Sequence, residues 1–130
     1  MLRKRYFYFA ALVWMPAIVH SAEVESLLDK YRQQGVEQFS AIKGETRWNL
    51  VNGDNSGRSC SDCHGSNLSQ VGKHAKTGKR IEPMAPSANP KRLTDMAKIE
   101  KWFKRNCKWT LGRACTPQEK GDFLVFLQQQ

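Results

Sequence analysis

Cys60-Ser61-Asp62-Cys63-His64 decides the fold of this chain, because it places two thiols three positions apart with a histidine directly after the second. This pattern is the attachment signature of c-type haem. Within about one helical turn both sulfurs can form thioethers to the haem vinyl groups while the adjacent imidazole faces the iron. The alternatives are a dithiol redox pair or half of a zinc site, but further ligands at zinc spacing are not obvious. The motif therefore predicts one covalently bound haem c, held by Cys60, Cys63 and His64.

The first residues are typical of an export signal. A basic start at residues 3–5 precedes an apolar stretch over residues 6–19, and small residues follow at Ser21 and Ala22. The apolar stretch is shorter than the roughly 20 residues that a membrane-spanning helix needs, which disfavours a permanent anchor. We therefore expect a signal peptide over residues 1–22, cut after Ala22 or Ser21, and a periplasmic cytochrome c domain over residues 23–130.

Two further cysteines lie in the mature part of the chain. With Cys60 and Cys63 used for haem, Cys107 and Cys115 remain as a pair in an oxidising compartment. A disulfide between them is the natural inference, and two buried free thiols are the alternative. Closing so short a loop would stabilise the fold by on the order of 2–3 kcal/mol.

Apolar residues recur at helical spacing in the first part of the mature chain. The pattern predicts an amphipathic helix over residues 24–34, ending near Gly35. A second helix is expected between Val36 and Trp48, before a Gly- and Asn-rich break. The residues expected to turn inward on this second helix are Phe39, Ile42 and Trp48.

A third helix is expected from a cap at Thr94 to about Asn106. At 100° per residue, Asn106 falls on the same face as Ile99, Trp102 and Phe103. A polar amide thus ends an apolar stripe, and a buried amide needs a partner. That partner is usually a backbone group or a helix end, and in a haem protein it can be the iron.

The last helix has the clearest start. Thr116-Pro117-Gln118-Glu119 forms a capping box with proline at the first helical position, and the helix that follows should bury Phe123, Leu124 and Leu127.

Residues 65–90, in contrast, are rich in Gly, Ser, Lys and Pro, so regular structure there should be short. We expect this loop to wrap the haem edge and distal face rather than to be a disordered linker. Together these segments predict a small all-α domain of four or five helices around one covalently attached haem, as in class I cytochromes c.

The mechanism depends on the group that faces the iron opposite His64, because a strong permanent ligand gives electron transfer whereas a weak or absent one permits gas binding. Met84 ranks first from spacing alone, since a methionine in the distal loop is the ligand of conventional electron-transfer cytochromes. His74 stands among lysines and is expected to be solvated, and Met96 is expected to fill the core. Asn106 is the fourth candidate.

Residues 60–127 closely resemble the monohaem c-type cytochromes known as the sphaeroides haem protein (SHP) family. The segments that carry this resemblance are Cys60-Ser61-Asp62-Cys63-His64-Gly65, Thr77-Gly78-Lys79, Ala85-Pro86-Ser87-Ala88, Ile99-Glu100-Lys101-Trp102, Arg105-Asn106-Cys107, Gly112-Arg113 and Cys115-Thr116-Pro117. The resemblance implies that Asn106 is the sixth ligand of the ferric iron and that Cys107 and Cys115 are disulfide-bonded. It also implies a switch, in which the asparagine leaves the iron on reduction and opens a site for oxygen or nitric oxide.

The ligand chemistry agrees with this implication. An amide oxygen is a hard, weakly basic donor that should prefer ferric to ferrous iron, while a methionine sulfur prefers the reduced metal. Because Met84 stands in the distal loop, conventional ligation by His64 and Met84 remains the alternative to ligation by His64 and Asn106.

The charge of the chain points to a protein partner. Lys and Arg total 21 against 12 acidic residues, and between Lys73 and Arg113 twelve basic residues face only Glu82, Asp95 and Glu100. Such a surface around the haem can steer an acidic electron donor, and the resemblance implies a dihaem cytochrome c as that donor. Nucleic acid is a poor partner for an exported protein.

We therefore predict a periplasmic protein that is reduced by a partner cytochrome and then binds a diatomic gas. The alternative is a plain electron shuttle with His64 and Met84 as fixed ligands. Enzymatic turnover of oxygen, peroxide, hydroxylamine or nitric oxide is a third possibility, which the sequence does not demand. No distal histidine paired with an arginine stands out, although Arg105 or Arg113 could approach the iron.

Overall fold

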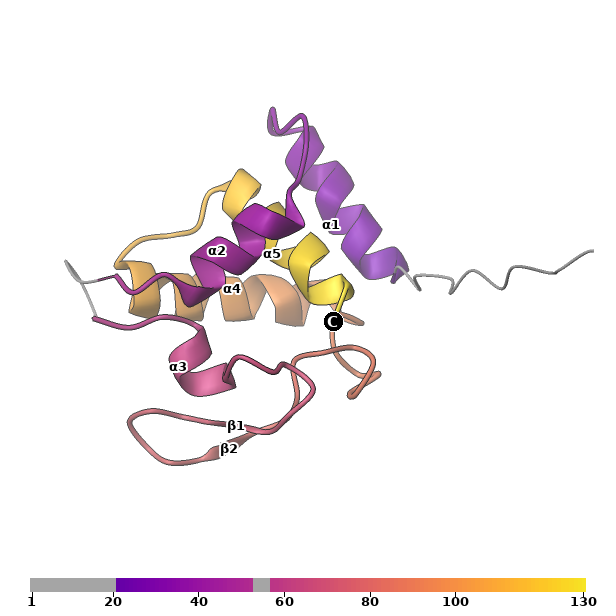
Figure 1. Ribbon diagram of the computed structural model, residues 1–130. Helices are drawn as coiled ribbons and strands as arrows, with labels where there is room; N and C mark the ends of the chain where they lie inside the picture. Colours follow the sequence, from indigo (N-terminus) through magenta and orange to yellow (C-terminus); the bar gives the residue numbers. More distant parts are fainter. Residues whose placement is uncertain (1–20, 53–56) are drawn as a thin grey trace, which may run out of the picture.

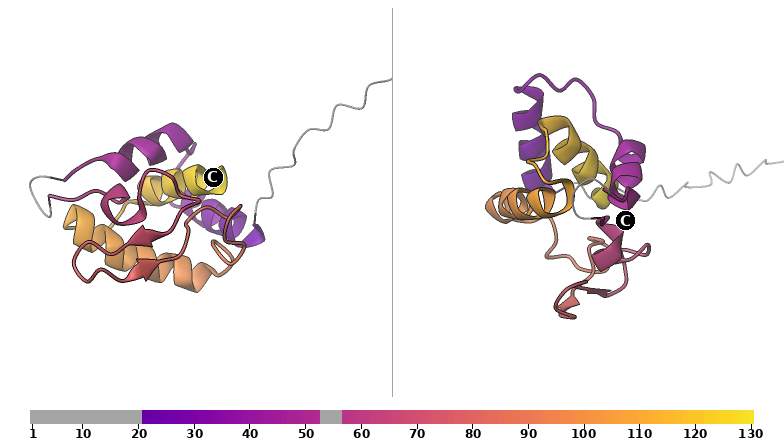
Figure 2. Two further views of the ribbon diagram at one scale, coloured as in Figure 1. Left: turned by 60° about the horizontal axis from the view of Figure 1, so that its bottom comes forward. Right: turned by 90° about the vertical axis from the view of Figure 1, so that its left-hand side faces the viewer.

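The computed structural model describes residues 21–52 and 57–130, so most of the predicted signal peptide lies outside the described residues. The elements are α1 (Ala22–Arg32), α2 (Ala41–Asn49), α3 (Ser61–His64), β1 (Gly72–Lys73), β2 (Arg80–Ile81), α4 (Met96–Leu111) and α5 (Pro117–Gln128). Figures 1 and 2 show α1, α2 and α5 on one side of α4, and α3 with the two strands on the other. None of the helices in this part of the chain combines the length and apolarity needed to cross a bilayer.

Helix α1 confirms the first predicted helix. Its apolar positions, which are Val24, Leu27, Leu28 and Tyr31, are all buried. The hydroxyl of Ser21 accepts a hydrogen bond from the Val24 amide and caps the helix at its N-terminus. The chain leaves the helix through Gly35, whose φ of +92° is the left-handed conformation that glycine adopts readily. These residues pack against Ile99 and Leu124 in one of the two apolar clusters of the core.

Helix α2 packs tightly on α5, and one prediction for it is wrong. The helix begins after Ser40, whose hydroxyl accepts a hydrogen bond from the Lys43 amide. This start turns Gly44 and Trp48 inward, one turn apart, and leaves Ile42 77% exposed instead of buried. A Cβ at Gly44 would overlap the backbone carbonyl of Asp122, so the two helices approach through bare backbone.

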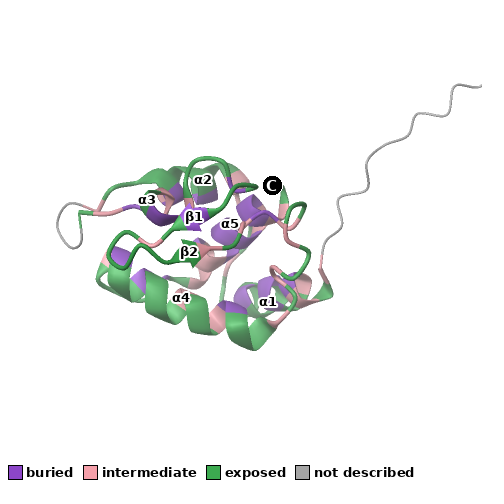
Figure 3. Cartoon of the chain, turned by 90° about the horizontal axis from the view of Figure 1, so that it is seen from below, coloured by how far each residue is buried: buried purple, intermediate pink, exposed green. Residues whose placement is uncertain are grey.

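Helix α4 differs from its prediction at both ends. Its cap is Asp95 rather than Thr94, and the Asp95 carboxylate accepts a hydrogen bond from the Lys98 amide. The helix continues past Asn106 to Leu111 and ends at Gly112, so Cys107 lies in the helix. Met96, expected in the core, is exposed in the first turn. Seen from the side of the strands, α4 presents mostly exposed residues (Figure 3).

The predictions of α5 and of little regular structure in residues 65–90 are confirmed. The capping box of α5 is present in full, and Phe123, Leu124 and Leu127 are buried. Residues 65–90 contain only the two-residue strands β1 and β2, which pair antiparallel. The loop is nevertheless ordered by specific bonds, since the Leu68 carbonyl accepts from the amides of both Met84 and Ala85, each at 2.9 Å.

Candidate haem site

Helix α3 carries both thiols and the histidine on a single turn. Cys60 occupies the N-cap position just before the helix, and its carbonyl accepts from the amides of Cys63 at 3.3 Å and His64 at 3.2 Å. The Cys60 amide donates to the carbonyl of Trp48 at 3.0 Å, which attaches the motif to the end of α2. Because residues three apart share one face of a helix, the thiols of Cys60 and Cys63 lie on the same side, and neither forms a disulfide.

Flanking residues explain why so short a helix forms. The Ser59 amide donates to the Asp62 carboxylate at 2.8 Å, and the Asp62 amide donates back to the Ser59 hydroxyl at 3.2 Å. This reciprocal pair satisfies amides that the first turn leaves without helical partners. Gly65, with a φ of +76°, then ends the helix directly after His64.

Strand β1 covers Cys63. A Cβ at Gly72 would overlap the backbone carbonyl of Cys63, so only glycine permits this approach. The Ala75 amide donates to the Cys63 sulfur at 3.3 Å, and Cys63 is 8% exposed. The strand pair and α3 therefore form one unit around the second cysteine.

His64 has the properties of a neutral metal ligand. Burial, and to a lesser extent the positive charge of Arg92, lowers the pKa of His64 to about 4. Its Nδ1 atom is buried and has no hydrogen-bond partner among the described residues. The ring lies against Trp48, with ring centroids 5.2 Å apart. A neutral imidazole that is held in place by packing, with an uncommitted nitrogen, fits an axial ligand of haem iron.

The competing interpretations of the motif fit less well. Burial is the largest cause that raises the pKa of the Cys60 thiol to about 11, and Cys63 and Asp62 add to it. A reactive dithiol needs a lowered pKa, so this environment disfavours a redox pair. In the described ranges, no group of three or more His, Cys, Asp or Glu side chains is placed to hold a metal ion, which disfavours zinc.

One apolar cluster brings the haem motif together with the distal candidates. Cys60 and Met84 both pack against it, and Cys107 is among its buried members. Its other buried members include Trp48 and Phe123. The motif, the Pro-rich loop and the C-terminal half of α4 therefore face a common core, as a haem held between them requires.

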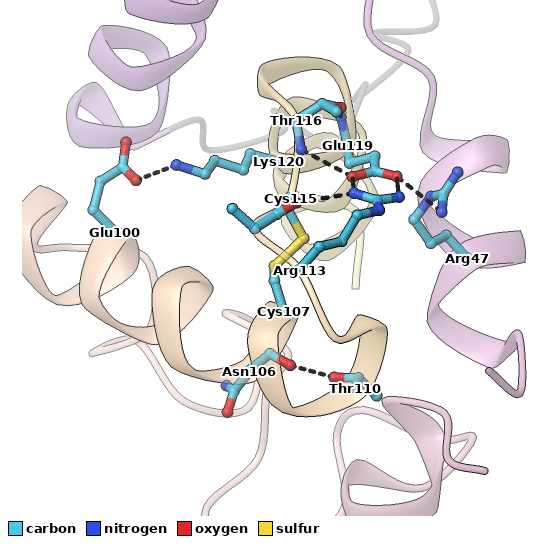
Figure 4. Close-up of a disulfide and its surroundings, with 11 residues drawn as sticks. Arg47, Glu100, Asn106, Cys107, Thr110, Arg113, Cys115, Thr116, Glu119 and Lys120 are labelled. Atoms are coloured by element: carbon cyan, nitrogen blue, oxygen red, sulfur yellow. Dashed lines mark hydrogen bonds and ion pairs between the residues drawn. A yellow bond between two sulfur atoms is a disulfide. The ribbon is translucent and has the colours of Figure 1, made fainter. Parts of the chain in front are cut away.

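Asn106 is exposed rather than buried, which corrects the predicted apolar stripe. Its side chain has no hydrogen-bond partner in the described part of the chain, and Figure 4 shows it directed away from the Cys107–Cys115 disulfide. Trp102 and Trp109, four residues before and three residues after it, are 49% and 39% exposed. Ile99 is buried, as expected. The amide thus lies between two large aromatic side chains that this chain leaves partly uncovered, as a site for a flat apolar group would.

His74 and the two arginines considered for the site have other partners. His74 is half-buried rather than solvated, its Nδ1 accepts from the amides of Lys76 and Thr77, and its ring stacks on Trp109 with centroids 5.4 Å apart. The Arg105 guanidinium lies over the Trp102 ring. Arg113, the other arginine considered for the site, pairs with Glu119.

Three supporting residues were not predicted for this site. Trp48 was expected to face inward but not to contact His64, and nothing in the sequence pattern distinguishes Gly72 from other loop glycines. Arg92 donates to the carbonyl oxygens of Pro83 at 2.8 Å and Glu82 at 2.6 Å. These bonds hold the residues directly before Met84 to the segment that contains Arg92. The only signal for Arg92 in the sequence is its place shortly after Pro83, Pro86 and Pro90, where a long side chain can satisfy carbonyls that have no strand partner.

Comparisons with known proteins identify several that are similar to this chain. A family model described as a domain of unknown function, DUF1924, matches residues 34–127. The chain is 36% identical over 97% of its length to the cytochrome c-type protein SHP of Cereibacter sphaeroides, and it covers 98% of that protein. It is 46% identical to cytochrome c'' of Methylophilus methylotrophus over 52% of its own length and 47% of that protein.

Solved structures give the same result. The structure of oxidized SHP, described as an oxygen-binding cytochrome c, matches with a TM-score of 0.75 and 36% identity, over 85% of this chain and 100% of the other. Oxidized cytochrome c'' from Methylophilus methylotrophus matches with a TM-score of 0.68 and 34% identity, over 81% of this chain and 92% of the other. The predicted class I cytochrome c-like fold is thereby confirmed.

Proposed function

The chain belongs to the DUF1924 family and to the SHP family of c-type cytochromes, and from this premise we propose that it is an exported monohaem cytochrome c whose iron exchanges its sixth ligand when the oxidation state changes. Haem, when bound, supplies an iron that accepts and releases one electron and can hold a small ligand. The whole-length identity to SHP carries this proposal.

In this proposal Cys60 and Cys63 attach the haem and His64 binds the iron. The two thiols lie on one helical turn, unpaired, as two thioether bonds to one ring require. The imidazole of His64 is neutral at physiological pH because burial lowers its pKa to about 4, so it presents a lone pair without losing a proton first. Trp48 fixes the plane of the imidazole by packing against it.

Asn106 is the proposed sixth ligand of the oxidised protein. Its amide makes no competing hydrogen bond in the described part of the chain, and the disulfide that follows it holds the end of α4 to the loop before α5. A hard amide oxygen favours the ferric over the ferrous state, so reduction weakens its hold. The departure of the side chain then leaves room for oxygen or nitric oxide. The relative described as an oxygen-binding cytochrome c supports this choice.

The proposed electron donor is an acidic dihaem cytochrome c. The basic residues between Lys73 and Arg113 are nearly all exposed, and Lys76 lies directly after the residue whose amide contacts the Cys63 sulfur. Charge reversal at Lys76 and Lys79 should therefore slow reduction by such a donor at low ionic strength and have little effect at high ionic strength. We assign electron transfer and gas binding to the protein rather than an enzymatic turnover.

Export completes the proposal. Residues 1–22 would form the signal peptide and residues 23–130 the periplasmic domain. The basic start and the apolar stretch support this division.

The proposal is tested by absorption spectra of the purified holoprotein in its ferric and ferrous states, with and without carbon monoxide. We expect a five-coordinate ferrous iron that binds carbon monoxide, and an altered ferric spectrum in Asn106→Ala but not in Met84→Ala. A ferrous iron that excludes carbon monoxide in the wild type, and admits it only in Met84→Ala, would instead establish the conventional electron shuttle. Half-buried Met84 contacts the same apolar cluster as Cys60, so this competing ligation must be tested directly.

A further inference from the structure

Glu119, in the first turn of α5, is a carboxylate with an exposed side-chain fraction of 8% that binds two arginines from different parts of the chain. Arg113 donates to both of its oxygens, at 2.8 Å and 2.7 Å, in a bidentate pair. Arg47 approaches Oε1 at 2.9 Å, and the Thr116 amide donates to Oε2 at 2.9 Å. Figure 4 shows both guanidinium groups converging on this one carboxylate.

Each arginine belongs to a segment next to a proposed axial ligand. Arg113 lies in the loop between Cys107 and Cys115, which the disulfide closes, and Cys107 directly follows Asn106. Arg47 lies in α2, directly before Trp48, whose ring packs against His64. Glu119 therefore connects the peptide segment beside Asn106 to the helix that supports His64.

The connection combines an ionised carboxylate with a fixed bonding geometry. The hydrogen bond from Arg113, followed by the Thr116 amide and the charge of Arg47, outweighs the effect of burial and lowers the pKa of Glu119 to about 2, so the carboxylate stays ionised. The bidentate geometry fixes the orientation of the Arg113 guanidinium as well as its distance. Since Glu119 also completes the capping box of α5, it cannot shift without moving the start of that helix.

We propose that Glu119 is a positioning residue for the sixth-ligand side of the site. By holding Arg113, it fixes the disulfide-closed loop, and through that loop the last turns of α4, at the distance from α2 that lets Asn106 reach the iron. The inference rests on the proposed function, because it takes Asn106 as the ligand. A purely structural role for Glu119 would lower stability without changing how fast the ligand exchanges.

Glu119→Gln separates these two roles. Glutamine at this position still completes a capping box and has the same size, so the helix start is retained while the charge that holds both guanidinium groups is removed. Arg113→Lys is the second variant, because lysine keeps the positive charge but cannot form the bidentate pair. Glu100→Gln is the matched control. Glu100 is also partly buried and binds Lys30, Lys120 and Tyr31, but none of these residues lies in the disulfide loop.

The experiment measures, by stopped-flow absorbance of the ferric holoprotein, the rate at which imidazole displaces the sixth ligand. We expect Glu119→Gln and Arg113→Lys each to raise this rate by roughly tenfold, and Glu100→Gln to leave it within about twofold of the wild type. Unchanged rates in Glu119→Gln and Arg113→Lys, together with loss of the displacement phase in Asn106→Ala, would overturn the inference and leave the proposed function standing. An unchanged displacement phase in Asn106→Ala would overturn both.

Discussion

The indole ring of Trp48 packs against the imidazole of His64 and also contacts Phe123 and Phe126 of α5, with ring centroids 5.2, 6.2 and 6.0 Å away. Trp48, a residue of α2, therefore contacts both α5 and the histidine of the haem motif. The proximal side of the site rests on the packed contact between α2 and α5, whereas Asn106 is exposed on α4. This asymmetry suits one fixed ligand and one that can leave.

Truncation of Trp48 should destabilise the protein strongly. Trp48→Ala removes a buried aromatic side chain from the core, and we expect a loss of about 3–5 kcal/mol in the free energy of unfolding, measured with urea on the holoprotein. Ile42→Ala on the same helix is the control, because Ile42 is exposed, and it should change stability by less than about 0.5 kcal/mol. Equal losses in the two variants would contradict the orientation of α2.

Gly72→Ala should separate β1 from the haem motif. The added Cβ would overlap the Cys63 carbonyl, and a backbone group cannot turn aside as a flexible side chain can. We expect a loss of about 2 kcal/mol or more in thermal unfolding. Val71→Ala, next to it and exposed, should cost less than about 0.5 kcal/mol, and a Gly72→Ala variant as stable as Val71→Ala would refute the close approach.

Removal of the disulfide should weaken the fold measurably. Replacement of both Cys107 and Cys115 by alanine is expected to lower the free energy of unfolding by about 2–3 kcal/mol in guanidinium titrations. A reductant should lower the stability of the wild type by a similar amount and leave the double variant unchanged. If the reductant affected both proteins alike, its target would lie elsewhere.

The contribution of Glu119 should depend on pH in one direction. Its pKa is about 2 in the folded protein against an ordinary value of 4.5, so the carboxylate stabilises the fold above about pH 4.5 and loses this effect as the pH falls through 2. We expect the wild type to exceed Glu119→Gln by about 2 kcal/mol near pH 6, a value reduced for screening because Arg113 is half exposed. Unfolding of both holoproteins at several pH values measures the gap. A gap that stays constant down to about pH 2.5 would show that ionisation of Glu119 is not its source.

The elements that the sequence predicted correctly are those with local determinants. The spacing of Val24, Leu27, Leu28 and Tyr31 defines α1, and the capping box at Thr116 defines the start of α5. Each pattern can be recognised because its own residues lie within a few positions of one another. The haem motif is local in the same sense. Its three residues occupy one turn, and the structure adds the contacts that hold that turn in place.

The predictions that failed depended on contacts between distant segments. Ile42 has the hydrophobicity of a core residue, but the approach of Gly44 to Asp122 decides which face of α2 is buried, and no local pattern reveals that approach. The same limit applies to Glu119, where the capping box could be predicted but the pairing with Arg47 could not. Asn106 was expected to be buried because it shares a helix face with apolar residues. The position on the helix does not show how far the rest of the chain covers that face, and Asn106 is exposed.

Closure of the β1–β2 pair over Cys63 constrains the order in which this cytochrome is made. In the finished fold the Cys63 sulfur is largely enclosed and accepts the Ala75 amide, so a porphyrin arriving late would have to reopen the hairpin to reach it. If Cys63 carries haem as proposed, the thioether bond would form before the strands close over this residue. On this view maturation comes first and folding second, and a chain that folded too early would become a dead end of biogenesis.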